Sequence, residues 1–264
     1  MCHEPNSLPA VPHDPNVAVI RESLTLTAAD GAPFAGFAAR SPRRSGVGVL
    51  VFPDIRGLSP FYHELAARLA EHGHVAAAID YFGRTAGIGE RGADFPFMEH
   101  VTHLTRAGLQ ADLAAAVAYL RSPAGGSGRA VVGLGFCFGG RQAFLSATYS
   151  HDLAGVIGFY GFPGPVRNAP GPTQLATAIA SPVLALWGGA DEGIPPSEVS
   201  AFAEGLTAAG VEHETVTYPG APHGFFETRQ EDFAGASADA WGRVLDFIER
   251  HGVQGKRLTS TSAE

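Results

Sequence analysis

Cys137 is the residue whose surroundings in the sequence point most clearly to chemistry. It stands in the segment Gly135-Phe136-Cys137-Phe138-Gly139, directly after the apolar run Ala130–Leu134. In a nucleophile elbow a strand turns sharply into a helix, and glycines two positions either side of the nucleophile relieve the resulting crowding. The pattern therefore predicts a cysteine nucleophile whose thiolate is favoured by the start of the following helix. The alternative is a core cysteine in a glycine-rich turn, because cysteines outside disulfides are often buried.

An acid and a histidine follow the cysteine in the order that such chemistry requires. Asp191 comes after the apolar run Val183–Trp187, and His223 lies in the loop after the run Glu214–Tyr218. The imidazole would exchange a proton with the sulfur, while the carboxylate would hold the other ring nitrogen and stabilise the imidazolium. Taken alone, Asp191 could instead cap the next helix, and His223 could be an ordinary loop histidine. Together with Cys137, in the order nucleophile, acid, histidine, they predict a catalytic triad.

Acyl transfer also needs hydrogen-bond donors for the oxyanion that forms during the reaction. The backbone N–H after the nucleophile, that of Phe138, is one expected donor. The second is expected from a loop after an earlier strand, where Ile55 in the segment Pro53–Gly57 has the right place. Both assignments rest on position in the chain.

These residues need a scaffold that brings distant loops to one place. Apolar runs alternate with helical patterns through most of the chain, which predicts an α/β fold: a mostly parallel central sheet flanked by helices on both faces. Functional groups gather at the carboxyl ends of the strands in such a sheet. The residues that follow the apolar runs of this chain are Asp54, Arg84, Cys137, Asp191 and His223.

The sequence divides into one domain and two short ends. We expect a flexible N-terminal arm over residues 1–16, a single α/β domain over 17–252 and a flexible tail over 253–264. Asp30-Gly31, between two alternating segments, predicts a β-hairpin at the start of the domain. Residues 85–104 are irregular and form either a lid over a site or a plain surface excursion.

Composition excludes several classes of protein. The 264 residues carry a formal net charge of −8, which argues against nucleic acid or an anionic membrane as partner. The N-terminus lacks the pattern of a signal peptide, and with Cys2 in the predicted arm a structural disulfide is not expected, so we expect a cytoplasmic protein. The pairs His72/His74 and His100/His103 lack a third ligand at suitable spacing, so no metal is expected.

Motifs along most of the chain resemble the dienelactone hydrolase (carboxymethylenebutenolidase) family of the α/β-hydrolase superfamily. The cysteine in the elbow is the most discriminating of them, since most members of the superfamily carry serine there. The matching segments lie between about residues 46 and 250 and comprise Val51–Gly57, Asp80–Arg84, Gly135–Gly140, Phe159–Gly161, Trp187–Asp191 and Pro222–Phe225. The resemblance implies the α/β-hydrolase fold and a Cys-Asp-His triad that cleaves a small-molecule lactone or ester through an acyl-enzyme, with no cofactor.

Two positions depart from the pattern of that family. Asp54 stands where the family typically has a glutamate that contacts and helps to activate the thiol; here it either retains that role or only organises the turn. Arg84 matches the first of two arginines that hold a carboxylate substrate, but Glu227 occupies the place of the second. An acid there would repel such a substrate. Tyr160 follows a strand end and either lines the pocket or packs in the core.

Three functions stay open on the sequence alone. The leading interpretation is a cysteine hydrolase of small lactones or esters. A thioesterase or acyltransferase would use the same triad, because all of these reactions pass through an acyl-sulfur intermediate. A catalytically silent binding protein is the third, given the departures at Asp54 and Glu227. A monomer or a small homo-oligomer is expected in each case.

Overall fold

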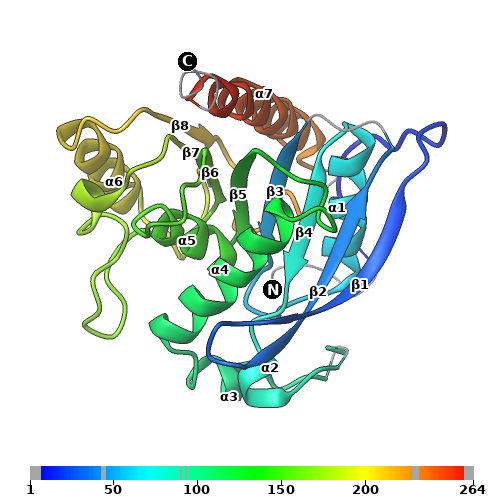
Figure 1. Ribbon diagram of the computed structural model, residues 1–264. Helices are drawn as coiled ribbons and strands as arrows, with labels where there is room; N and C mark the ends of the chain where they lie inside the picture. Colours follow the sequence, from blue (N-terminus) through cyan, green and yellow to red (C-terminus); the bar gives the residue numbers. More distant parts are fainter. Residues whose placement is uncertain (1–6, 43–45, 90, 93, 228–231, 259–264) are drawn as a thin grey trace.

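A computed structural model describes residues 7–42, 46–89, 91–92, 94–227 and 232–258, which build an eight-stranded sheet with helices on both faces (Figure 1). The order across the sheet is β1-β2-β4-β3-β5-β6-β7-β8. The pairs from β4 to β8 are parallel, and β1 and β2 add an antiparallel edge. The predicted α/β class is therefore confirmed. The strands are β1 (Ile20–Thr27), β2 (Pro33–Arg40), β3 (Val47–Phe52), β4 (Val75–Ile79), β5 (Ala130–Phe136), β6 (Gly155–Phe159), β7 (Val183–Gly188) and β8 (His213–Tyr218).

Burial on both faces explains why the central strands are continuous apolar runs. Every residue of β3, β4 and β5 is buried, as expected for parallel strands covered by helices. The edge strand β1 is exposed at most of its positions instead. The predicted hairpin joins β1 to β2 around Gly31, whose φ of 85° lies in the left-handed region that glycine adopts without strain. The hairpin prediction is confirmed.

Helices α4 (Arg106–Arg121) and α5 (Phe138–Ser146) cover one face of the sheet, and α1 (Pro60–Glu71) and α7 (Ala234–Leu258) cover the other (Figure 1). Helix α6 (Pro196–Ala208) packs beside β8, and the short elements are α2 (Gly83–Ala86), α3 (Phe97–Val101) and η1 (Ala176–Ala178). Helix α7 runs past the domain boundary expected at residue 252. Gly252 is buried against Val47, and a glycine weakens a helix without ending it. Residues 259–264 of the expected tail lie outside the described residues.

The segment 85–104 is fastened to the body of the protein at several points. Arg91 donates to the buried Asp80 at 2.9 Å. The ring of Phe95 packs against Phe82, with centroids 5.2 Å apart, and stacks on His100 at 4.9 Å. The short helix α3 lies within this segment. Whether the segment moves as a lid stays a prediction.

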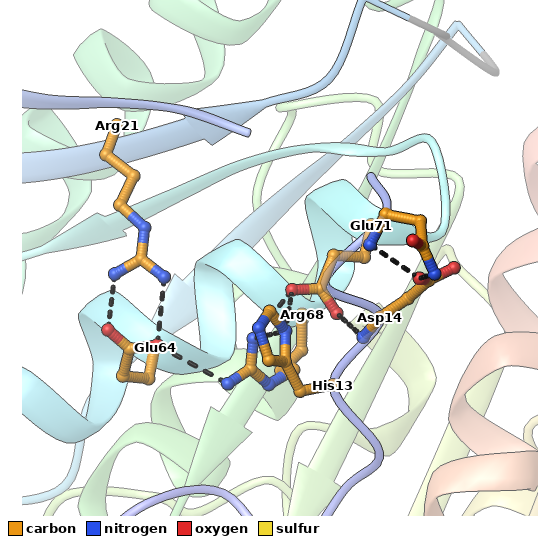
Figure 2. Close-up of polar contacts among 7 residues, drawn as sticks. His13, Asp14, Arg21, Glu64, Arg68 and Glu71 are labelled. Atoms are coloured by element: carbon orange, nitrogen blue, oxygen red, sulfur yellow. Dashed lines mark hydrogen bonds and ion pairs between the residues drawn. The ribbon is translucent and has the colours of Figure 1, made fainter. Parts of the chain in front are cut away.

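Part of the expected N-terminal arm lies against α1 (Figure 2). The buried carboxylate of Glu71 accepts hydrogen bonds from the backbone of Asp14 at 3.0 Å and from Arg68 at 2.6 Å, and it lies 2.7 Å from the ring of His13. Arg68 also pairs with Glu64, which pairs in turn with Arg21 of β1. The arm and the edge strand are therefore linked to α1 by one network of ion pairs and hydrogen bonds. Residues 1–6, with Cys2 among them, lie outside the described part of the chain.

In the described part of the chain, no helix has both the length and the apolar character to cross a bilayer. The same residues include no cluster of three or more histidine, cysteine or acidic side chains that could hold a metal ion.

Candidate active site

Cys137 stands at the tip of β5, where the strand turns directly into α5. Its backbone has φ 53° and ψ −115°, a conformation that a non-glycine residue adopts at a cost of about 1–3 kcal/mol. A Cβ at Gly135 would lie 2.1 Å from the carbonyl oxygen of Gly139, and one at Gly139 would lie 2.1 Å from that of Phe52. Both glycines are therefore required by close backbone contacts, as the elbow pattern predicts. The thiol is partly buried, at the N-terminal end of α5.

The structure brings Asp191 and His223 together from the loops after β7 and β8. Nδ1 of His223 lies 2.6 Å from Oδ2 of Asp191, within hydrogen-bonding distance. The carboxylate is buried and the imidazole is partly exposed, so the ring can meet both the acid and solvent. Oδ1 of Asp191 accepts from the backbone N–H of Gly193, which fixes the carboxylate in its loop. Both loops end parallel strands, so they lie at the same edge of the sheet as Cys137.

The loop that contains Ile55 is held by two buried tyrosines. Tyr81 donates its hydroxyl to the carbonyl of Pro53 at 2.8 Å, and its ring meets the ring of Phe138 edge-on at 5.2 Å. Tyr62 of α1 accepts from the backbone N–H of Asp54 at 2.7 Å. Burial is the largest cause that raises the pKa of both tyrosines, so their hydroxyls stay protonated. The loop next to the elbow is therefore rigidly placed, while the donor roles of Ile55 and Phe138 stay predictions.

Asp54 is fully buried and shapes this loop. Its Oδ1 accepts from the backbone N–H of Arg56 at 2.8 Å, and its carbonyl accepts from that of Gly57 at 3.1 Å. The charge of Asp54 is also among the causes that raise the pKa of Tyr62 and of Tyr81. Asp54 therefore organises the turn. Its action on the thiol stays a prediction.

Arg84 is held by two carboxylates of the protein itself. Its guanidinium donates to Asp112 of α4 at 2.8 Å and to Asp30 of the β1–β2 turn at 2.7 Å, and all three of its nitrogens take part. The hydrogen bond from Arg84 lowers the pKa of Asp30, whereas burial raises that of Asp112. A substrate carboxylate would have to compete with both. These hydrogen bonds therefore give no support to the prediction that Arg84 binds a substrate carboxylate, which stays a prediction.

Glu227 is fully buried and accepts hydrogen bonds from two tyrosines. Its Oε1 accepts from the hydroxyl of Tyr62 at 2.5 Å and its Oε2 from that of Tyr160 at 2.9 Å. Tyr160 is itself fully buried, has a positive φ of 37°, and lies with its ring 4.9 Å from the ring of His223. The acid expected to face a substrate is thus engaged by protein hydroxyls.

A cavity of about 640 Å³ is bounded in part by Arg56, the residue after Ile55, whereas Cys137, Asp191 and His223 are not among its lining residues. One wall comes from β1 and β2, a second from the end of the loop and the start of α1, and a third from Ile88, Gly89, Arg91, Gly92, Phe95 and Phe97. The lining is largely apolar, with Arg56, His63 and Arg91 as its basic side chains. The apolar members include Leu24, Leu58, Pro60, Ile88, Phe95 and Phe97.

Sequence reasoning did not find Tyr62 and Tyr81. Tyr62 lies on the buried face of α1 with Leu65 and Leu69, so its spacing marks it as a core residue. A hydroxyl on such a face requires a buried hydrogen-bond partner, and that requirement was the available signal. The partners, Asp54 and Glu227, are identified by the tertiary structure alone.

Comparisons with known proteins agree with this architecture. A model of the dienelactone hydrolase family matches residues 34–252. The chain is 31% identical over 261 residues to the carboxymethylenebutenolidase of Rhodococcus opacus, covering 95% of this chain and 97% of that protein. It is similar to a crystal structure of a candidate dienelactone hydrolase from Klebsiella pneumoniae, with a TM-score of 0.77, 26% identity, and 88% and 99% of the two chains covered.

A further neighbour shows the fold alone. It is a promiscuous phosphotriesterase, similar to dienelactone hydrolases and obtained from metagenomic libraries, with a TM-score of 0.70 at 24% identity and with 87% and 98% of the two chains covered. The family match, the relative covered along nearly its whole length and the eight-stranded sheet agree with one another. The chain belongs to the dienelactone hydrolase family of the α/β-hydrolase fold and is a hydrolase that acts on lactone or ester bonds.

Proposed function

We propose that Cys137 is the nucleophile, His223 the general acid and base, and Asp191 the orienting acid in the hydrolysis of small lactones or esters. The thiolate attacks the carbonyl carbon, the C–O bond breaks, and His223 returns the proton to the departing alkoxide. Water then hydrolyses the acyl-sulfur bond, with His223 as base, and releases the acid and the thiol. The 2.6 Å contact between His223 and Asp191, at the sheet edge that carries the strained Cys137, is the observation that carries this proposal.

The backbone N–H groups of Phe138 and Ile55 would hold the negative oxygen of the tetrahedral intermediate. Phe138 is the first residue of α5, so its N–H lies at the positive end of that helix. Ile55 stands in the loop braced by Tyr62 and Tyr81. Donors fixed in place before the reaction stabilise the developing charge without reorganisation, and each contributes about 10²–10³ in kcat.

The cavity beside Ile55 is the place we propose for the apolar part of the substrate. Its volume of about 640 Å³ falls in the range of small-molecule sites, and Arg56 links its wall to the predicted oxyanion loop. An alkyl or aryl ester fits this largely apolar lining. The substrate class we infer is therefore a small ester or lactone with an apolar substituent.

The test compares the wild type with Cys137→Ala and Cys137→Ser on p-nitrophenyl esters and neutral lactones. We expect the alanine variant to fold and to lose activity, and iodoacetamide to inactivate the wild type as it alkylates Cys137, which peptide mass spectrometry distinguishes from alkylation of Cys2. Glu249→Gln, a change at an exposed position of α7, serves as the control. Full activity in Cys137→Ala would refute the proposal.

A further inference from the structure

Glu227 occupies an unusual position for a carboxylate. It is fully buried, four residues after His223, and its backbone N–H closes a turn onto the carbonyl of Gly224 at 3.0 Å. Burying an acidic side chain is costly unless hydrogen bonds compensate for the lost hydration. The two hydroxyls of Tyr62 and Tyr160 supply such bonds, one to each carboxylate oxygen. A group maintained at such cost beside a reaction site calls for a functional explanation.

The first arm of this arrangement reaches the predicted oxyanion loop. The backbone N–H of Asp54 donates to the hydroxyl oxygen of Tyr62, and that hydroxyl donates to Glu227. A hydroxyl that donates to a carboxylate becomes a better acceptor for the next donor in the chain. Asp54 directly precedes Ile55, so the carboxylate fixes the residue before the predicted donor.

The second arm reaches the histidine. Tyr160 donates to Glu227, and its ring lies 4.9 Å from the ring of His223 at an angle of 54°. The same tyrosine follows β6, whose last residue, Phe159, accepts from the backbone N–H of Cys137 at 3.0 Å. Glu227 therefore hydrogen-bonds both to Tyr160, whose ring packs against His223, and to Tyr62, which binds the oxyanion loop.

We propose that Glu227 is a positioning residue that holds the oxyanion loop and His223 in register with each other through Tyr62 and Tyr160. The inference rests on the proposed function and goes beyond it, because it assigns to Glu227 a role in the rate of the chemical step rather than in substrate binding. A carboxylate suits this role because it accepts from two hydroxyls at once. A glutamine offers a single acceptor oxygen, so one of the two hydroxyls would lose its acceptor at residue 227 and would have to reorient to accept from the amide N–H.

The experiment measures Glu227→Gln, Tyr62→Phe and Tyr160→Phe on a neutral p-nitrophenyl ester, with Glu204→Gln on the exposed side of α6 as the matched control. We expect Glu227→Gln to lower kcat about tenfold while KM changes by less than about twofold, because positioning affects the transition state more than the ground state. We expect the double variant Glu227→Gln/Tyr62→Phe to have a kcat no lower than that of the slower single variant, because both changes break the same chain of hydrogen bonds.

Alkylation of Cys137 by iodoacetamide separates the role of Tyr62 from that of Tyr160, because this reaction needs a thiolate and no oxyanion hole. Tyr62→Phe should lower kcat and leave the alkylation rate unchanged. Tyr160→Phe should shift the pH dependence of alkylation, since it removes the hydrogen bond that fixes the ring packed against His223. A purely structural role would instead lower kcat and alkylation together, in proportion to the loss of folded protein measured by circular dichroism.

The outcomes separate this inference from the proposed function. If Glu227→Gln keeps kcat within about twofold of the wild type while Cys137→Ala is inactive, the inference fails and the proposed function stands. If Cys137→Ala is active, the proposed function fails first. If Glu227→Gln does not fold, Tyr62→Phe decides, since it keeps the buried ring and removes only the hydroxyl between Glu227 and Asp54; an unchanged kcat in that variant overturns the inference.

Discussion

His223 and Asp191 are joined by one short contact, 2.6 Å between Nδ1 and Oδ2, although they stand in different loops and are separated by 32 positions in the chain. The buried carboxylate fixes the ring and leaves Nε2 for the reaction. Asp191→Asn would keep the shape and remove the charge. We expect kcat to fall by about 10³–10⁴ at unchanged fold, as for the equivalent change in other triads. Ester turnover together with circular dichroism checks this expectation, and Glu192→Gln, its exposed neighbour, is the control.

Asp54 offers a second test. Asp54→Asn keeps an oxygen to accept from the N–H of Arg56 but loses the charge, whereas Asp54→Glu keeps the charge and lengthens the side chain. If Asp54 helps to activate the thiol, the asparagine variant should lose about tenfold or more in kcat/KM and in alkylation rate, and the glutamate variant should retain more of both. Stopped-flow alkylation and steady-state kinetics measure the two effects. Unchanged values in both variants would reduce Asp54 to a turn residue.

Arg84 is expected to matter for stability more than for substrate affinity. Arg84→Gln would leave the buried Asp112 without its guanidinium partner, and we expect a loss of about 2–3 kcal/mol in the free energy of unfolding. Asp30→Asn removes the exposed half of the same contact and should cost much less stability, because solvent screens an exposed ion pair. Urea unfolding measures both variants. A selective rise in KM for carboxylated esters in Arg84→Gln, with unchanged stability, would restore its role as a substrate ligand.

The buried His74 should make the protein sensitive to acid. Burial, with a smaller contribution from the charge of His72, lowers the pKa of His74 from 6.5 to about 4. The unfolded chain therefore binds a proton that the folded chain does not bind between these values. The free energy of unfolding should fall as the pH drops from about 6.5 toward 4, by about 2 kcal/mol at pH 4.5 for this group.

Two other histidines act in the same direction, because burial also lowers the pKa of His151 and of His251. Urea unfolding at pH 7 and pH 4.5 compares the wild type with His74→Gln. The variant should lose less stability between the two pH values than the wild type. An equal loss in both proteins would show that His74 does not contribute to the acid sensitivity.

The cavity beside Ile55 predicts how activity depends on the length of the acyl chain. Ile88 lines this cavity, whereas Met98, a comparably exposed apolar residue of α3, is not among its lining. We expect Ile88→Trp to lower kcat/KM for p-nitrophenyl octanoate relative to the acetate by about tenfold, because the ring fills part of the space. Met98→Trp should leave the ratio unchanged. Equal ratios in both variants would place the acyl chain elsewhere.

Local patterns in the sequence were sufficient for the framework. The apolar runs of β3 to β7 and the Asp-Gly turn before β2 predict parallel strands and a hairpin, because burial on both faces and turn chemistry act over a few neighbouring residues. Gly135 likewise marks the elbow locally, because a Cβ there would clash with the carbonyl of Gly139, whereas the clash that Gly139 avoids is with Phe52 on the neighbouring strand β3. The family resemblance rests on the same short segments and is confirmed by the match over residues 34–252.

The partners of the polar side chains were decided by the tertiary structure. The positions of Arg84 and Glu227 in the sequence do not depend on which groups they contact. The sequence therefore gives no sign that Asp30 and Asp112 bind Arg84. It likewise gives no sign that Tyr62 and Tyr160 donate to Glu227. Those partners come from elements up to 165 positions away. A hydrogen bond depends on distance and direction in space, which local propensity does not fix, and packing of α1 and α4 against opposite faces of the sheet supplies both.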